Sequence, residues 1–187
     1  MSEREKMLAG ELYDASDEEL VALRLQARLM TEKLNLTSIQ FSEQRQDLIT
    51  SLFGATGSTL HVESPFHCDY GRHIHVGDNF YANFGCVILD VALVTIGDDC
   101  LIGPQVGIYT ATHPVEPIAR KQGREFAQPI TIGDNCWIGG HAVINPGVTL
   151  GNNVVVASGA VVTRSFGHNV VIGGNPAQVI KQVPLSS

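Results

Sequence analysis

An aliphatic residue returns at every sixth position through residues 130–165. The series consists of Ile132, Ile138, Ile144, Leu150, Val156 and Val162, and a second, usually smaller apolar residue stands two positions before each member. A period of six matches neither the α-helical period of 3.6 nor the period of 2 of a single strand. It indicates a short strand and a corner repeated as one unit. Glycine followed by Asp or Asn, as at 133–135 and 151–153, supplies corners that tolerate left-handed backbone conformations. The pattern predicts a β-solenoid.

Residues 1–58 lack this rhythm and show α-helical spacing instead. Ser16 and Glu19 fit a capping box, and apolar residues follow at helical intervals as far as Leu34. A second helix is predicted from about residue 38 to residue 53, where Gly54 ends it. Because a solenoid needs its exposed end covered, we expect a helical N-terminal cap over residues 1–58 and a solenoid over residues 59–187.

The solenoid rhythm begins loosely near residue 60 and is interrupted once. The six-residue step is present at Val76, Ala82 and Ile88, fails at residues 113–117, and returns only at Ile130. Long loops in compact repeat domains are often functional. We therefore predict a protruding loop over residues 113–129 and a C-terminal tail that ends the coils with the turn residues of 173–177.

Composition narrows the classes of function. A chain of 187 residues suits one main domain, and its formal charge of −7 argues against a nucleic-acid partner, which requires a clustered basic surface. The charged first residues lack the apolar core of a signal peptide, and no apolar run approaches membrane-spanning length. These features predict a cytoplasmic protein that has neither a nucleic-acid nor a membrane partner.

The cysteines are best explained by packing. Cys86, Cys100 and Cys136 each stand two residues before an aliphatic residue, at the position that Ala142 and Ala160 also occupy. A catalytic thiol or a disulfide is the alternative, and it is disfavoured by a buried register and a reducing compartment. No CxxC spacing indicates zinc.

Several motifs resemble those of the hexapeptide-repeat acyltransferases, in the branch of the maltose and galactoside acetyltransferases. The matching segments are Cys-Asp-Tyr-Gly at 68–71, Asn-Phe at 83–84, Thr-Ala-Thr-His-Pro at 110–114, Trp-Ile-Gly-Gly at 137–140, Val-Ile-Asn-Pro-Gly at 143–147 and Gly-Asn-Pro-Ala at 174–177. The resemblance implies an all-β left-handed parallel β-helix with three faces, a helical N-terminal cap and a homotrimer. Its left hand is an exception to the general rule for parallel crossovers.

A β-helix with three faces has the shape of a prism, and the positions whose side chains point into it determine which residues point outward. Asn83 directly follows an inward position, Trp137 lies between two of them, and His113 stands at the base of the predicted loop. The interior of such a narrow prism is filled by its own side chains. Its flat outer faces lack the concave shape that small ligands prefer. A binding cleft must then come from the loop, the cap or another subunit, and we expect active sites between subunits.

The resemblance also assigns roles to these residues. It implies that His113 is the general base that takes the proton of a sugar hydroxyl, and that Asn83 contacts the acceptor and stabilises the transition state. The acceptor-site candidates are Asp69, Asn83, Asp90, Glu125 and Trp137. The coenzyme A candidates are Gly140, Ser158, Thr163, Arg164, Gln178 and Lys181. Arg164 replaces a common lysine, whereas Gln178 replaces a common arginine and so removes one positive charge.

The function expected from the resemblance is transfer of an acetyl group from acetyl-CoA to a hydroxyl of maltose, glucose or a related sugar, without a metal. A galactoside or another oligosaccharide is an alternative acceptor. A metal-dependent hydratase is a more remote alternative, because six-residue steps carry His61, His67 and His73 to different faces. A non-catalytic solenoid is the last alternative, although it would be expected to have lost His113 or the loop.

Overall fold

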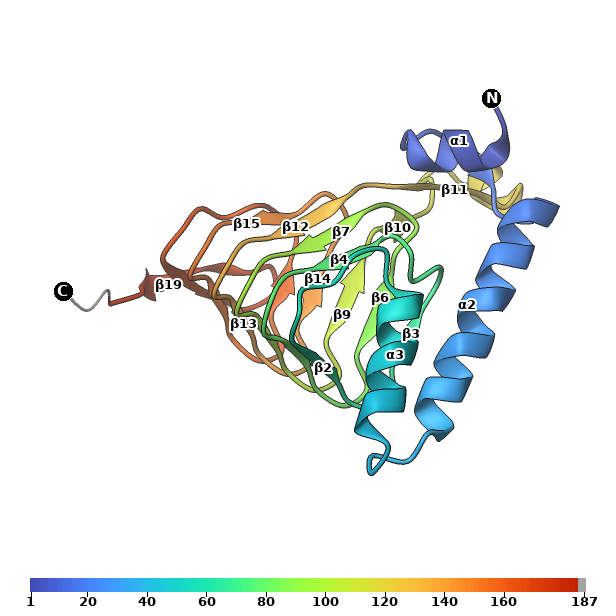
Figure 1. Cartoon of the computed structure of the whole chain (residues 1–187). Helices are drawn as coiled ribbons and strands as arrows, with labels where there is room; N and C mark the ends of the chain where they lie inside the picture. The colour runs from blue at the N-terminus through green and yellow to red at the C-terminus, as the bar shows by residue number, and fades with distance from the viewer. Residues whose placement is uncertain (185–187) are drawn as a thin grey trace.

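The computed structural model describes residues 1–184, which form a parallel β-solenoid with helices gathered at its N-terminal end (Figure 1). We name its three faces after their first strands. The β2 face contains β2 (Leu60–Val62), β5 (Phe80–Ala82), β8 (Leu101–Ile102), β13 (Trp137–Ile138), β16 (Val155–Val156) and β18 (Val170–Gly173), with β19 (Gln178–Gln182) antiparallel at its end. The β3 face contains β3 (His67–Cys68), β6 (Val87–Leu89), β9 (Gly107–Tyr109), β14 (Val143–Ile144) and β17 (Val161–Val162). The β4 face contains β4 (Ile74–Val76), β7 (Val94–Ile96), β12 (Ile130–Ile132) and β15 (Thr149–Leu150).

Residues one coil apart pair in register on every face. Ile138 pairs with Val156 on the β2 face, and Ile144 pairs with Val162 on the β3 face. All the six-step aliphatic residues are buried in one continuous core. The predicted β-helix with its helical cap is therefore confirmed. The packing role of the cysteines is also confirmed, since all four are free and buried.

The corner between the β4 and β2 faces depends on residues that accept a left-handed backbone. Asn79, Asp99, Asn135 and Asn153 occupy this corner in successive coils with φ values of 54° to 57°. The Asn135 amide donates to Oδ1 of Asn153 at 2.8 Å, so the corner side chains also bond from coil to coil. Asp and Asn tolerate this conformation better than other non-glycine residues, which explains the repeated sequence signal.

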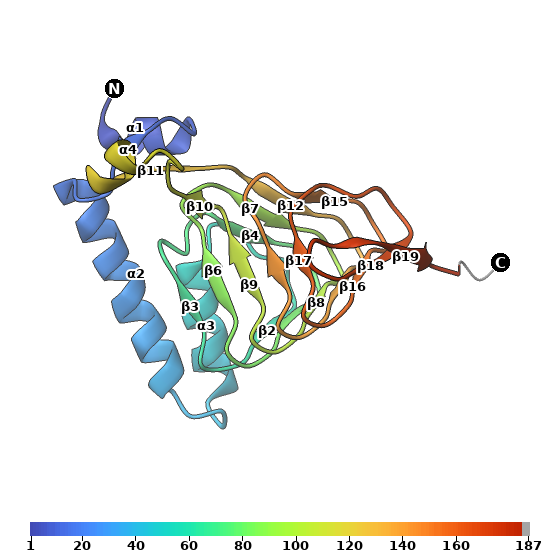
Figure 2. The same ribbon diagram turned by 180° about the vertical axis from the view of Figure 1, so that it is seen from behind.

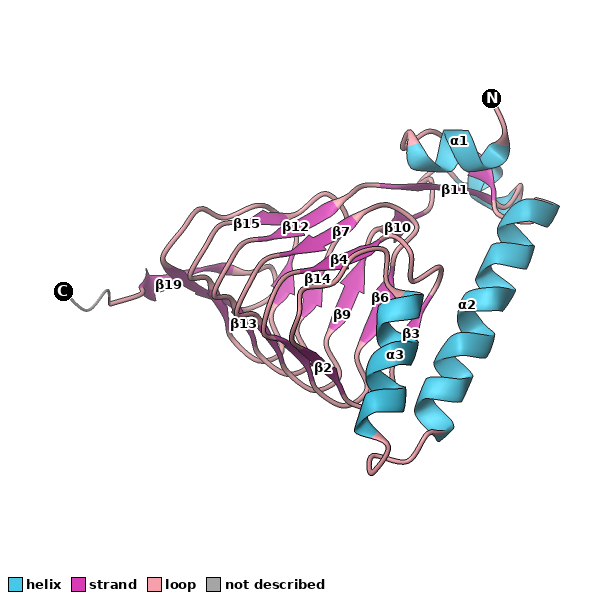
Figure 3. Cartoon of the chain, viewed as in Figure 1, coloured by secondary structure: helices cyan, strands magenta, loops and turns pink. Residues whose placement is uncertain are grey.

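The cap contains α1 (Glu3–Leu8), α2 (Glu18–Leu36) and α3 (Ser42–Leu52), all at one end of the solenoid (Figure 3). Ile49, Leu52 and Phe53 join the core of the first coils, so α3 closes the open end. The capping box predicted at Ser16 is wrong, because Asp17 is the N-cap and accepts from the Glu19 and Leu20 amides. A capping box that the sequence analysis missed is present at Ser2 and begins α1.

The interrupted segment leaves the solenoid after β10 (Ala111–Thr112) and contains α4 (Pro117–Lys121) and β11 (Arg124–Ala127). Strand β11 lies between β10 and β1 (Tyr13–Asp14) in a three-stranded antiparallel sheet. Seen from behind, α4 and β11 lie beside α1 and the N-terminal end of α2 (Figure 2). In the part of the chain that the structure describes, no helix has the length and apolar character needed to cross a membrane.

Candidate functional site

Three coils and the loop bring polar residues to the corner between the β3 and β4 faces. Asp69 follows β3, Asp90 follows β6, and His113 follows β10 just after β9. A cavity of about 260 Å³ lies at this corner. Its lining includes Tyr13, Arg24, Arg28, Asp69, Tyr70, His113 and Glu125. The solenoid, the loop and the cap of a single chain therefore form this cavity together.

His113 exposes 54% of its side chain at the cavity. Its Nδ1 atom lies 3.3 Å from the carbonyl oxygen of Arg124. A proton on Nδ1 can donate to that carbonyl, which leaves the Nε2 lone pair free to accept a proton. The Nε2 atom lies 4.0 Å from Oε1 of Glu125, beyond the length of a direct hydrogen bond. A ligand hydroxyl that reaches Nε2 can therefore also meet the carboxylate.

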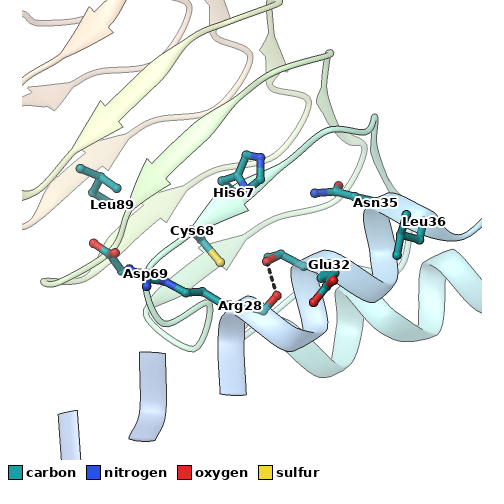
Figure 4. Close-up of a pocket in the computed structure, with 9 residues that line it drawn as sticks. Arg28, Glu32, Asn35, Leu36, His67, Cys68, Asp69 and Leu89 are labelled. Atoms are coloured by element: carbon teal, nitrogen blue, oxygen red, sulfur yellow. Dashed lines mark hydrogen bonds between the residues drawn. The ribbon is translucent and has the colours of Figure 1, made fainter. Parts of the chain in front are cut away.

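Asp69 is half-buried opposite two arginines of α2. Burial raises the pKa of Asp69, whereas the positive charges of Arg24 and Arg28 oppose that shift. Arg24 donates to the hydroxyl of Tyr70 at 2.8 Å and to the carbonyl of Ala15 at 2.6 Å. Arg28 reaches toward Asp69 from the helix (Figure 4). This part of the cavity thus offers both a carboxylate and guanidinium donors to a polar ligand.

The cavity continues into a groove of about 510 Å³ between α2 and the first strands of the β3 face (Figure 4). Arg28, Asp69 and Leu89 line both spaces. Glu32, Asn35 and His67 line the groove farther from His113. A ligand bound at His113 therefore has room to extend along the helix.

The structure corrects the assignment of Asp90 to the acceptor site. Its side chain is fully buried. Its Oδ1 accepts the amides of Asp69 and Tyr70 at 3.0 and 2.9 Å, and its Oδ2 accepts the amide of His73 at 3.3 Å. A carboxylate without exposed surface cannot contact a ligand. Asp90 instead holds the turn that carries Asp69.

Burial raises the pKa of Asp90 to about 7. Since the unfolded value is about 3.8, the folded protein keeps a proton between about pH 4 and pH 7 that the unfolded chain has lost. The contribution of Asp90 to stability is therefore greatest at low pH and declines as pH rises through this window. We expect wild type to lose stability relative to Asp90→Asn from pH 5 to 7, at up to about 1.4 kcal/mol per pH unit. Unfolding measured at several pH values for both proteins tests this, and parallel curves would contradict it.

Asn83 and Trp137 lie at a different place. Together with Gly140 and Ser158 they line an open hollow of about 530 Å³ at the corner between the β2 and β3 faces. Asn83 Oδ1 accepts the amide of Phe84 at 2.8 Å, which leaves the N–H donors of the side-chain amide for another partner. One chain therefore does not bring Asn83 together with His113.

The remaining coenzyme A candidates lie near the C-terminal end of the solenoid. Thr163 and Arg164 are exposed directly after β17, at the same corner as His113, and Gln178 and Lys181 are exposed on β19. Arg164 donates to Oε1 of Gln178 at 2.7 Å and lies 4.8 Å from the ring centre of Phe166. Gln178 thus accepts a hydrogen bond from Arg164, which a positively charged residue there could not do.

Three residues of the cap that line the cavity are not among the site residues predicted from the sequence. Tyr13, Arg24 and Arg28 line it beside His113. A signal existed for the two arginines, because residues four apart on a predicted helix share one face. The pairing of Tyr13 with a strand far along the chain has no local signal in the sequence.

Comparison with known proteins gives consistent matches over the whole chain. Residues 6–57 match the maltose acetyltransferase hexapeptide capping motif, and residues 93–113 and 129–164 match the hexapeptide repeat of succinyl-transferase. The crystal structure of a maltose O-acetyltransferase from Clostridium difficile 630 has 46% sequence identity and a TM-score of 0.97, over 99% of both chains. A galactoside acetyltransferase in complex with coenzyme A has 42% identity and a TM-score of 0.95, over 98% of this chain and 92% of that one. The galactoside O-acetyltransferase of Escherichia coli K12 is 42% identical over 179 residues, which cover 96% of this chain and 88% of that protein.

Proposed function

Since the chain belongs to the hexapeptide-repeat acyltransferases, in the branch of the maltose and galactoside O-acetyltransferases, we propose that it moves an acetyl group from acetyl-CoA to a hydroxyl of maltose, glucose or a related sugar. The observation that carries the proposal is the exposed His113 imidazole in a cavity that also holds the carboxylates of Asp69 and Glu125. A cytoplasmic location stays a prediction.

In the proposed reaction His113 is the general base. Its Nε2 accepts the proton of the acceptor hydroxyl while the hydroxyl oxygen attacks the thioester carbonyl carbon. The Nδ1 contact with the Arg124 carbonyl, at 3.3 Å, supports this tautomer and stabilises the imidazolium that forms. When the intermediate collapses, the carbon–sulfur bond breaks and the imidazolium returns the proton to the departing thiolate. The products are the acetylated sugar and coenzyme A.

Asn83 is the proposed donor to the oxyanion. The bond between its Oδ1 and the Phe84 amide restricts the orientation of its side-chain amide. A preorganised donor of this kind contributes about 3 kcal/mol to transition-state stabilisation. Because Asn83 and His113 of one chain occupy different corners, this role requires Asn83 from a second subunit.

The outer surfaces of the solenoid support a homotrimer. On the β2 face, Tyr81, Leu101 and Trp137 stack outward in register, and Leu101 and Trp137 are 51% and 55% exposed. The outward residues of the β3 face are also mostly apolar, with Val143 paired to Val161. By contrast, the β4 face presents threonines in the same register, such as Thr131 opposite Thr149. Apolar side chains that stay at least partly exposed on two of three faces favour burial between copies of the chain.

Such an assembly also supports the coenzyme A assignment. Gly140 and Ser158 stack one coil apart at the corner that carries Asn83, and Thr163 and Arg164 lie at the corner that carries His113. If the corner that carries Asn83 in one subunit meets the corner that carries His113 in the next, these two pairs of coenzyme A candidates line the same groove. The cationic Arg164 and Lys181 then suit the phosphates of acetyl-CoA.

The groove beside the cavity favours acceptors larger than one sugar ring. It shares Arg28 and Asp69 with the cavity and continues along α2. Maltose fits this description, and so does the alternative of a galactoside or another oligosaccharide. Acetyl-CoA turnover measured with maltose, glucose, galactosides and lactose tests the proposal. Acetylation of none of these sugars would contradict it.

The carboxylates should govern acceptor binding. Replacing Asp69 or Glu125 with Ala removes hydrogen-bond acceptors for sugar hydroxyls, so we expect the KM for the sugar to rise about tenfold or more and that for acetyl-CoA to change little. Initial rates with each substrate varied in turn provide the measurement. Glu11→Ala, which removes an exposed carboxylate outside the cavity, is the control. An equal rise in both KM values would show that these carboxylates have another role.

A further inference from the structure

A strand of the N-terminal cap is paired with the strand that carries Glu125. Strand β1 runs antiparallel to β11, with Tyr13 opposite Glu125 and Asp14 opposite Arg124. On its other edge β11 pairs with β10, which directly precedes His113. The backbone of Glu125 is therefore held from both sides, and the cap is part of the wall around the proposed catalytic base.

The side chain of Tyr13 adds a directional contact to this pairing. It is fully buried, in a cluster with Met7, Leu20 and Val91. Its hydroxyl donates to Oε2 of Glu125 at 2.8 Å. Burial and the neighbouring carboxylate raise the pKa of Tyr13 well above its ordinary range, so the phenol stays protonated and can only donate to this acceptor.

The two oxygens of Glu125 are thereby given different surroundings. Oε2 is bound to Tyr13, whereas Oε1 lies 4.0 Å from Nε2 of His113 and faces the cavity. A glutamate on its own has a broad terminal torsion and would sample many carboxylate orientations. A fixed donor on one oxygen selects the orientation that presents the other oxygen beside the base.

We propose that Tyr13 is a positioning residue of the acceptor site. It holds Glu125 so that the free Oε1 atom of the carboxylate meets the hydroxyl of the acceptor sugar at His113. This inference rests on the proposed function. It assigns to the cap a direct part in acceptor selection, because the hydroxyl that fixes Glu125 comes from the N-terminal segment and is absent if phenylalanine stands at that position.

A double-mutant cycle tests the proposal. Tyr13→Phe removes the hydroxyl alone, and Glu125→Met removes the carboxylate at nearly constant side-chain length. In the wild-type background, Tyr13→Phe should lower kcat/KM for the sugar about tenfold, the usual size of a lost hydrogen bond to a charged group. The KM for acetyl-CoA should be unchanged. In the Glu125→Met background the same substitution should change kcat/KM less than about twofold, because the two residues act as one unit.

Tyr70→Phe is the matched control. It removes another buried hydroxyl from the same cavity, but one that bonds Arg24, so its effect should be about equal in both backgrounds. Equal losses from Tyr13→Phe in both backgrounds, or no loss in wild type, would overturn the role of Tyr13. Wild-type turnover is measured in the same assay. If wild type acetylates no sugar, the proposed function fails and this role fails with it, whereas an active wild type with additive losses refutes the role of Tyr13 alone.

Discussion

His113→Ala is expected to lower kcat by at least about two orders of magnitude. Positioned proton transfer typically contributes about 10²- to 10⁴-fold to a rate. His113 is the histidine that lines the cavity beside Asp69 and Glu125. Its loss should leave the KM for acetyl-CoA nearly unchanged, because in the proposed mechanism the imidazole acts on the acceptor hydroxyl.

The same variant should unfold at nearly the wild-type temperature. The side chain is 54% exposed, and its Nδ1 contact with the Arg124 carbonyl is long, at 3.3 Å. Steady-state rates and thermal unfolding of the same preparation separate catalysis from folding. His168→Ala removes an exposed histidine at a different corner and should retain wild-type turnover. A His113→Ala protein that keeps most of its sugar-dependent turnover would refute the role of His113 as base.

The solenoid could be predicted because its repeat is local and redundant. Every inward position must match the same position one coil later, so that Ile132 pairs with Leu150 and Ile138 with Val156. The period of six is therefore imposed on the sequence many times. The loop could be predicted for the opposite reason, since the solenoid cannot absorb residues 113–129 without losing this register.

The wall of the cavity could not be predicted in the same way. Tyr13 and Glu125 are 112 residues apart and join through one strand pair and one hydrogen bond. Neither short strand has a periodic pattern, because each contains few residues and is fixed by its partner rather than by its own propensity. The family resemblance implied that Glu125 contacts an acceptor, but it did not show which residue orients Glu125.

Asp90 illustrates an error that strand alternation could have prevented. It stands two residues after Ile88, whose side chain is in the core, and residues two apart in a strand share a face. Because side chains alternate between the two sides of a strand, Asp90 points inward like Ile88, and there it accepts hydrogen bonds from three backbone amides. A polar residue at a position that strand alternation points into the core is better interpreted as a buried acceptor for turn amides than as a residue that contacts a ligand.

The proposed division of the active site between the His113 corner of one subunit and the Asn83 corner of the next leads to the second large expected effect. His113→Ala and Asn83→Ala should each be nearly inactive alone, the latter because loss of an oxyanion donor costs about 10²- to 10³-fold. If the active site takes His113 from one subunit and Asn83 from the next, a mixed trimer contains one intact site whichever variant is in the majority. Co-expression of the two inactive variants, which lets mixed trimers assemble, should then restore activity.

The size of the restoration is fixed by symmetry. With equal amounts and random assembly, three quarters of the trimers are mixed, and each has one intact site of three, so turnover should recover to about a quarter of wild type. The variants are co-expressed with different tags, and turnover of the unfractionated population is compared with about a quarter of wild type. The mixed trimers are then isolated, where about a third of wild-type turnover is expected, and their mass is measured by sedimentation. Asn83→Ala combined with an Asn83, His113 double-alanine variant is the control and should stay inactive, since no subunit then carries an intact Asn83. Inactive mixed trimers, or a fully active wild-type monomer, would show that His113 does not use Asn83 of a neighbouring subunit.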